Sequence, residues 1–272
     1  MALPESDKFV MSPRDEWIMS RVAPTTRDLG PILSCHLDEA IVLSAYLNGE
    51  ITPEAAAQEI TKPSVVHSRC YQLMNLFVYA LRKLDQDTDM ILGLLLAIQN
   101  LPSTESLYWW KLPGFGKLWQ VHYNVSSNRN SKDPAFFKTT GILEAKMYLL
   151  DLYPVDESWV HRVLNLICLE KPNLEEVIYE IHAWLDIAGT KISERMQPAQ
   201  IKSFERCVRG RRDKTYEIQV TLYEHWEHWK KRFLQVSYDE EYLSAGSREM
   251  SRNCYEIMKG LVVSPPNPPE DI

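Results

Sequence analysis

Apolar residues along this chain recur with the period of an α-helix. From Ser64 to Leu84 they alternate steps of four and three, which places them on one stripe of a single long helix: Val66, Cys70, Leu73, Phe77, Ala80 and Leu84. Comparable stripes predict helices over 37–47, 87–101 and 117–125, others that begin near 134, 156 and 172, and two more with stripes over 218–233 and 250–261. No segment alternates apolar and polar residues between hairpin signals, so almost no sheet is expected.

These stripes predict an all-α protein with little or no β-sheet. We expect one compact domain of about ten helices over residues 36–262. Residues 1–35 form a partly ordered tail in this interpretation, and the proline-rich residues 263–272 form a disordered one.

Two of the predicted helices carry specific expectations. In the helix over 37–47, Leu37 and Ile41 lie on the face expected to be buried. The next helix begins at Pro53 and is expected to stop before Pro63. The reason is that a proline inside a helix removes a backbone hydrogen bond.

Residues 109–119 differ from the helical pattern on either side of them. This segment combines three tryptophans with one proline and two glycines. Pro113 restricts the preceding Leu112 away from helical geometry, and Gly114 and Gly116 allow the chain to turn. We therefore predict a buried non-helical turn in which Trp110 belongs to the core.

Composition and charge limit which cellular compartments and which classes of partner are expected. The net charge of −7 argues against a dedicated binder of nucleic acid or of anionic membranes, which is usually basic. The longest apolar run, Met90 to Ile98, is too short to span a bilayer. The first ten residues show no secretory or mitochondrial address, and the five isolated cysteines suit a reducing compartment. We expect a cytoplasmic or nuclear protein that is not secreted and has no membrane partner.

The sequence offers no convincing metal or cofactor motif. The acidic run from Asp85 to Asp89 resembles the start of a calcium loop, but Met90 and Leu96 occupy the positions that require Gly and Glu. The sequence has no CxxC pair, no HExxH, no phosphate-binding loop and no GxSxG elbow. His225 and His228 are one helical turn apart, and we interpret them as a half-buried structural histidine and a solvated one. We predict no metal and no cofactor.

Two groups of residues remain as candidate site residues. His122 and His225 are the candidates for an acid–base group. Five tryptophans either wall an apolar ligand pocket or simply fill the core: Trp109, Trp119, Trp184, Trp226 and Trp229.

The locally basic residues 202–214 have two interpretations. They either contact phosphate or an acidic partner, or they form a solvated loop. The interspersed Glu205 and Asp213 favour the loop, so no nucleic-acid partner is expected.

Several motifs in a fixed order resemble a known family. They are residues 110–116 (WKLPGFG), 183–189 (AWLDIAG) and 226–233 (WEHWKKRF), preceded by Tyr46-Leu47-x-Gly49 and Thr52-Pro53-Glu54-Ala55-Ala56 and followed by Met258. Over about residues 40–262 this order resembles a fungal family of uncharacterised proteins, domain of unknown function 3632. The chain departs from the family in lacking a tryptophan around residues 128–137. The resemblance implies an all-helical fold, a filamentous fungus and a setting in secondary metabolism, and it brings no catalytic residues.

The favoured function is a non-catalytic helical accessory or interaction protein that serves small-molecule biosynthesis. Its partner would be a protein or a hydrophobic small molecule. The rival is an enzyme that acts on a hydrophobic metabolite in a pocket lined by the tryptophans, and a third hypothesis is a regulatory or nucleic-acid-associated role through residues 202–214. A cavity with a polar group facing it would favour the enzyme, and a solid core with an exposed apolar groove would favour the binder.

Overall fold

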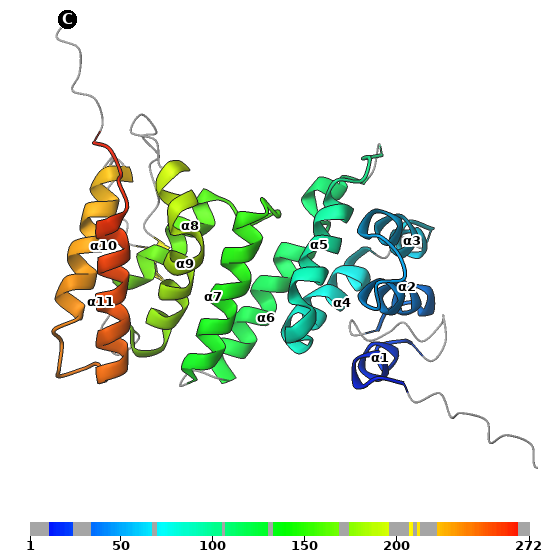
Figure 1. Cartoon of the computed structure of the whole chain (residues 1–272), viewed down its shortest axis with the longest axis horizontal. Coiled ribbons are helices and arrows are strands. Elements are labelled where there is room, and N and C mark those ends of the chain that lie inside the picture. Colours follow the sequence, from blue (N-terminus) through cyan, green and yellow to red (C-terminus); the bar gives the residue numbers. More distant parts are fainter. Residues whose placement is uncertain are drawn as a thin grey trace, which may run out of the picture. The chain divides into compact units, whose positions relative to one another are not determined.

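The computed structural model describes residues 11–23, 34–66, 70–104, 107–129, 133–168, 174–195, 207–208, 211–212 and 222–265. Across these residues the fold is all-α, as predicted (Figure 1). The one sheet in this part of the chain is a two-residue antiparallel pairing of β1 (Cys207–Val208) with β2 (Arg211–Arg212). No helix among these residues is both long enough and apolar enough to cross a bilayer. The rest of the basic stretch 202–214 lies outside the described residues.

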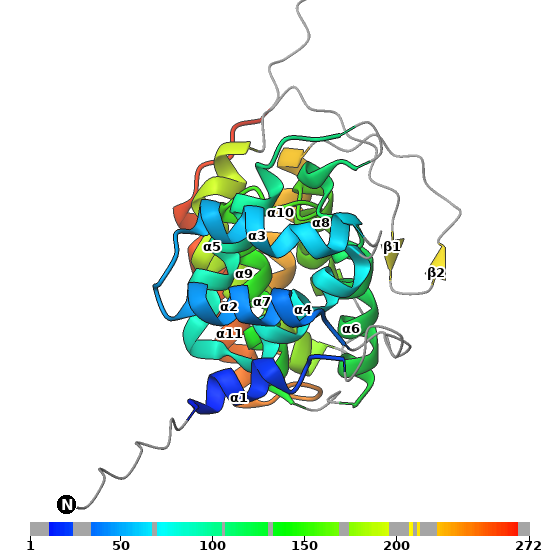
Figure 2. The same cartoon turned by 90° about the vertical axis from the view of Figure 1, so that its right-hand side faces the viewer.

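The helices form two compact units, Met1–Val121 and His122–Ile272. The first unit contains α1 (Pro13–Met19), α2 (Leu37–Leu47), α3 (Pro53–Val66), α4 (Cys70–Lys83), η1 (Asp85–Asp87), α5 (Thr88–Gln99), η2 (Trp109–Lys111) and the start of α6 (Phe115–Arg129). Within it α2 lies beside α3, and α3 packs on α5 (Figure 2). The core of this unit contains fully buried aliphatic and aromatic side chains, among them Leu43, Ile60, Leu73, Phe77, Ile91 and Leu94.

The outward face of α2 differs from the prediction. Leu37 is 44% exposed and Ile41 is 50% exposed, so the expectation that they face the core is wrong. The helix is rotated by a buried carboxylate, because Glu39 accepts hydrogen bonds from the Ser64 hydroxyl at 2.7 Å and from the His36 backbone N–H at 2.9 Å. The buried face therefore runs through Ala40, Leu43, Tyr46 and Leu47.

Helix α3 passes through Pro63 and ends at Val66, so the predicted stop before Pro63 is wrong. The missing N–H of a proline costs one hydrogen bond in the ladder. That cost is offset here because one face of α3, with Ala56, Ala57 and Ile60, is fully buried. The stripe predicted over 64–84 is divided between two described elements, because residues 64–66 belong to α3 and residues 70–83 form α4, and the residues between them lie outside the described part of the chain.

The tryptophan-rich segment 109–119 turns at residues 112–114, but the rest of it is helical rather than non-helical as predicted, because η2 covers 109–111 and α6 begins at Phe115. Leu112 follows η2 in the left-handed conformation (φ 40°) and Gly114 has φ 90°. Trp109 and Leu112 are buried, but Trp110 is 49% exposed, so its predicted place in the core is wrong. A 3-10 helix has three residues per turn, which aligns residues 109 and 112 on the inner face and leaves 110 about a third of a turn away.

The second unit contains the rest of α6 with α7 (Pro134–Leu149), α8 (Glu157–Leu164), η3 (Asn165–Cys168), α9 (Leu174–Arg195), β1, β2, α10 (Leu222–Val236) and α11 (Ala245–Gly260). Helices α7 and α9 approach each other closely at Gly141, because a Cβ on this residue would lie 2.5 Å from the Glu180 carbonyl oxygen. Lys191 of α9 fixes the end of α7 by donating to the carbonyl oxygens of Tyr148 and Leu149. Helix α11 packs against both α9 and α10 (Figure 1).

Candidate functional site

The first unit presents two large aromatic rings to solvent beside a lysine. Tyr108 and Trp110 are each 49% exposed. The Lys111 ammonium lies between them, 5.7 Å from the centroid of the Tyr108 ring and 4.8 Å from that of Trp110. We call these three residues the aromatic corner. Tyr71, which is 38% exposed, packs its ring against Gly114 just after the corner.

Buried residues within and directly after the aromatic corner hold it in place. Trp109, Leu112 and Phe115 are at most 4% exposed, and the Phe115 ring stacks on Trp119 at a centroid distance of 6.1 Å. The turn between Leu112 and Phe115 is closed by a backbone hydrogen bond of 2.9 Å. Because the backbone is fixed in this way, a partner that binds the corner orders few additional dihedral angles.

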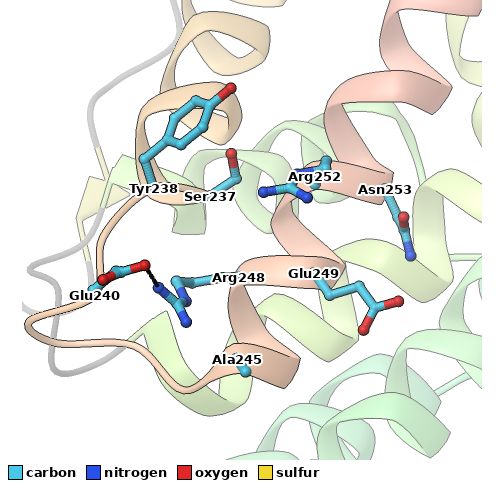
Figure 3. Close-up of a pocket in the computed structure, with 8 residues that line it drawn as sticks. All are labelled: Ser237, Tyr238, Glu240, Ala245, Arg248, Glu249, Arg252 and Asn253. Atoms are coloured by element: carbon cyan, nitrogen blue, oxygen red, sulfur yellow. Dashed lines mark ion pairs between the residues drawn. The ribbon is translucent and has the colours of Figure 1, made fainter.

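The five tryptophans proposed as pocket walls are all core residues, and they are divided between the two units. Trp109 and Trp119 belong to the first unit and the other three to the second, and none is more than 4% exposed. In the second unit the indole N–H of Trp184 donates to Glu144, and that of Trp229 donates to Asn165 at 3.3 Å. None of the five lines the polar cavity that Figure 3 shows between the end of α10 and the start of α11.

Glu144 is a buried carboxylate enclosed by indoles, and sequence reasoning did not find it. It is 2% exposed on α7, and one of its oxygens accepts from the indole N–H groups of Trp159 at 3.1 Å and Trp184 at 3.3 Å. A second buried carboxylate on α9, Glu180, accepts from the Tyr123 hydroxyl at 2.7 Å. Both carboxylates therefore have hydrogen-bond donors within the unit, which is how a protein core tolerates such groups.

Replacing Glu144 tests how strongly this network stabilises the second unit. Glu144→Ala leaves two buried indole donors without their acceptor and is expected to lower the free energy of unfolding by about 2–4 kcal/mol. Glu144→Gln keeps a carbonyl acceptor and should cost less than half as much. Urea denaturation of the two variants measures the difference, and equal losses would show that the indole hydrogen bonds contribute little.

The candidate histidines occupy different settings. His122 lies half-buried on α6. His225 is half-buried on α10, and its ring stacks on Trp229 at a centroid distance of 5.5 Å and meets His161 of α8 edge-on at 4.9 Å. Sequence reasoning had not singled out His161, which is 5% exposed. Burial, together with the charge of His225, lowers the pKa of His161 to about 3.

A neutral, buried His161 is a packing residue at neutral pH. A general base works best with a pKa close to the operating pH, which His161 does not have. No three His, Cys, Asp or Glu side chains gather as a metal site among the residues described. Burial also raises the pKa values of the Cys35 and Cys254 thiols, which keeps both in the unreactive protonated form.

No protein-family model, curated protein or solved structure matches this chain. The resemblance to the fungal family therefore stays a prediction.

Proposed function

We propose that this chain is a non-catalytic helical accessory protein that binds a protein partner through the aromatic corner. The observation that carries the proposal is the exposure of Tyr108 and Trp110 on a turn fixed by buried neighbours. Tryptophan and tyrosine are enriched at the energetic centres of protein interfaces, where their rings supply contact area at low entropic cost. In line with the family resemblance, we place this function in a fungus and in small-molecule biosynthesis.

The chemistry of the corner defines the partner segment. The two rings offer flat apolar faces, which suit proline or aliphatic side chains. The Lys111 ammonium between them adds a positive charge, so an acidic residue in the partner segment would be attracted to the same place. The proposed partner is therefore a protein segment that is proline-rich or apolar and carries at least one carboxylate.

The polar groups of the second unit support a non-catalytic role. Glu144 and Glu180 are held by indole and phenol donors, and His161 is kept neutral by burial. Each of these groups has a structural task in packing or hydrogen bonding. The tryptophans suggested as pocket walls are likewise core residues.

Complementation of a deletion strain of the producing organism, read out by untargeted metabolite profiling, tests the proposal. The double variant Tyr108→Ala, Trp110→Ala should lose the wild-type profile although its melting curve changes little. Lys111→Glu should lose it as well, whereas Lys111→Arg should retain it. Tyr242→Ala, a similarly exposed tyrosine in the second unit, is the matched control and should behave as wild type.

The same complementation assay distinguishes the interaction proposal from the rival hypothesis of an enzyme. His225→Gln should keep the wild-type profile if His225 is structural. A complete loss of product in a normally folded His225→Gln protein, with full activity in the corner variants, would replace the interaction proposal with a catalytic one.

A further inference from the structure

A polar cavity of about 450 Å³ lies where the end of α10 turns into α11 (Figure 3). Its volume lies within the range of about 300–1,000 Å³ that is common for small-molecule sites. The lining is polar rather than apolar: Ser237, Tyr238, Glu240, Ala245, Arg248, Glu249, Arg252 and Asn253. This composition favours a charged ligand over a hydrophobic one.

Internal hydrogen bonds of the second unit fix the orientation of α11. The buried Ser251 hydroxyl donates to the Phe233 carbonyl at 2.8 Å, and the Ser247 hydroxyl donates to the Glu175 carbonyl at 2.8 Å. Arg248 and Arg252 each follow one of these serines by one residue. Since residues four apart share a face of a helix, the two arginines project together toward the cavity.

The two guanidinium groups differ in how they are neutralised. Arg248 pairs with Glu240 at 2.7 Å, and the Glu240 side chain is 84% exposed, which makes this a weak surface ion pair. No described carboxylate lies within ion-pair distance of Arg252, whose guanidinium carbon is 6.0 Å from the centroid of the Tyr238 ring. Figure 3 shows the Arg252 guanidinium directed toward Ser237 and that of Arg248 toward Glu240. The cavity therefore has one unneutralised guanidinium and a second that a ligand can recruit from a solvated carboxylate.

We propose that this cavity binds a small organic phosphate monoester, with its phosphoryl group between Arg248 and Arg252 and its organic part against Tyr238. Guanidinium forks match the oxygens of phosphate, and a monoester carries a charge of about −1.5 to −2 at neutral pH. Tyr238, which is 68% exposed, supplies an aromatic face for the organic part. Glu249 lines the same cavity, so a ligand with more negative charge, such as a polyphosphate, is disfavoured.

Titration of the full chain with phenyl phosphate at fixed ionic strength, followed by calorimetry, tests this assignment. Phenyl phosphate should bind more tightly than inorganic phosphate, which lacks the ring, and more tightly than benzoate, which carries less charge. Arg252→Gln should weaken phenyl phosphate binding by about tenfold or more, the size of one charge-assisted hydrogen bond. Tyr238→Ala should remove the advantage of phenyl phosphate over inorganic phosphate.

Two neighbouring glutamates provide a matched pair of controls. Glu240→Gln releases Arg248 and should strengthen binding, whereas Glu241→Gln removes the same charge from a neighbouring exposed residue and should have little effect. Arg162→Gln, an exposed arginine on α8, should leave binding unchanged. The assignment is overturned by the absence of binding heat, by undiminished binding in Arg252→Gln, or by equal effects of Glu240→Gln and Glu241→Gln.

Discussion

Trp109→Ala should lower the free energy of unfolding of the first unit by about 3–5 kcal/mol, the range for large buried aromatics, whereas Trp110→Ala should lower it by less than about 1 kcal/mol. The two residues are adjacent and chemically identical. They differ in exposure, which is 4% for Trp109 and 49% for Trp110.

The physical reason is the cavity that each truncation leaves. Removing the Trp109 indole opens a space inside a core that contains Leu112, Phe115 and Trp119, and these neighbours are held by the turn and by α6. The Trp110 indole is half exposed, so its removal leaves little cavity, and the contact with the Lys111 ammonium contributes about 0.5–1 kcal/mol at such an exposed site.

Hydrogen exchange of amides in residues 70–121 measures the effect within the first unit, and circular dichroism checks that both variants fold. Trp110→Phe serves as a further control, because it keeps an aromatic ring at the exposed position. Equal destabilisation by Trp109→Ala and Trp110→Ala would mean that Trp110 is packed in solution, and the aromatic corner would no longer be a surface for a partner.

Helical periodicity was sufficient to predict the fold class and most of the elements. The helix predicted over 37–47 has the boundaries of α2, and the starts expected near Pro134, Asp156 and Pro172 agree with α7, α8 and α9 to within two residues. Periodicity works here because a helix that buries one face must repeat apolar residues every three or four positions.

The errors at Pro63 and on α2 share one physical cause, which is tertiary packing that overrides local preference. Pro63 is accommodated because the burial of α3 offsets a lost hydrogen bond. Leu37 and Ile41 face solvent because the buried Glu39 sets the rotation of α2. A single sequence does not reveal such compensation, since it depends on residues that are distant along the chain.

The polar residues of the core were the hardest to anticipate. Charged side chains are seldom fully buried, so the sequence alone predicts that Glu144 and Glu180 are surface residues. Only the hydrogen-bond donors around them explain why they can be buried. The donors, Tyr123, Trp159 and Trp184, lie 15 to 57 residues away. The one available signal was an excess of tryptophan, whose N–H groups require acceptors when buried.

The second large effect is expected in acid and depends on His161. Burial beside His225 lowers its pKa from 6.5 to about 3 in the folded protein. Between these pH values the unfolded chain binds a proton that the folded chain excludes, so the unfolding free energy falls as the pH decreases. The stabilisation by the neutral histidine is complete above pH 6.5 and is lost toward pH 3, at about 1.4 kcal/mol per pH unit.

His161→Gln removes this titration and should flatten the pH dependence. At pH 5 the wild type should have lost about 2 kcal/mol through His161, relative to pH 8, and the variant should lack that contribution. Groups that do not interact with His161 act in both proteins alike. One of them is Glu39, whose pKa is raised by burial, so that its contribution makes the unfolding free energy rise as the pH decreases. Subtracting the two pH profiles therefore leaves the contribution of His161 together with its interaction with His225.

Urea denaturation at several pH values between 4 and 8 provides the measurement. His228→Gln removes an exposed histidine of α10 and controls for the loss of any histidine. It should keep the wild-type slope, whereas His161→Gln should have a shallower one at the cost of some packing at pH 8. Parallel profiles for His161→Gln and the wild type would show that the folded protein admits the proton at His161. That residue would then be open to solvent and available as an acid–base group, which would strengthen the case for an enzyme.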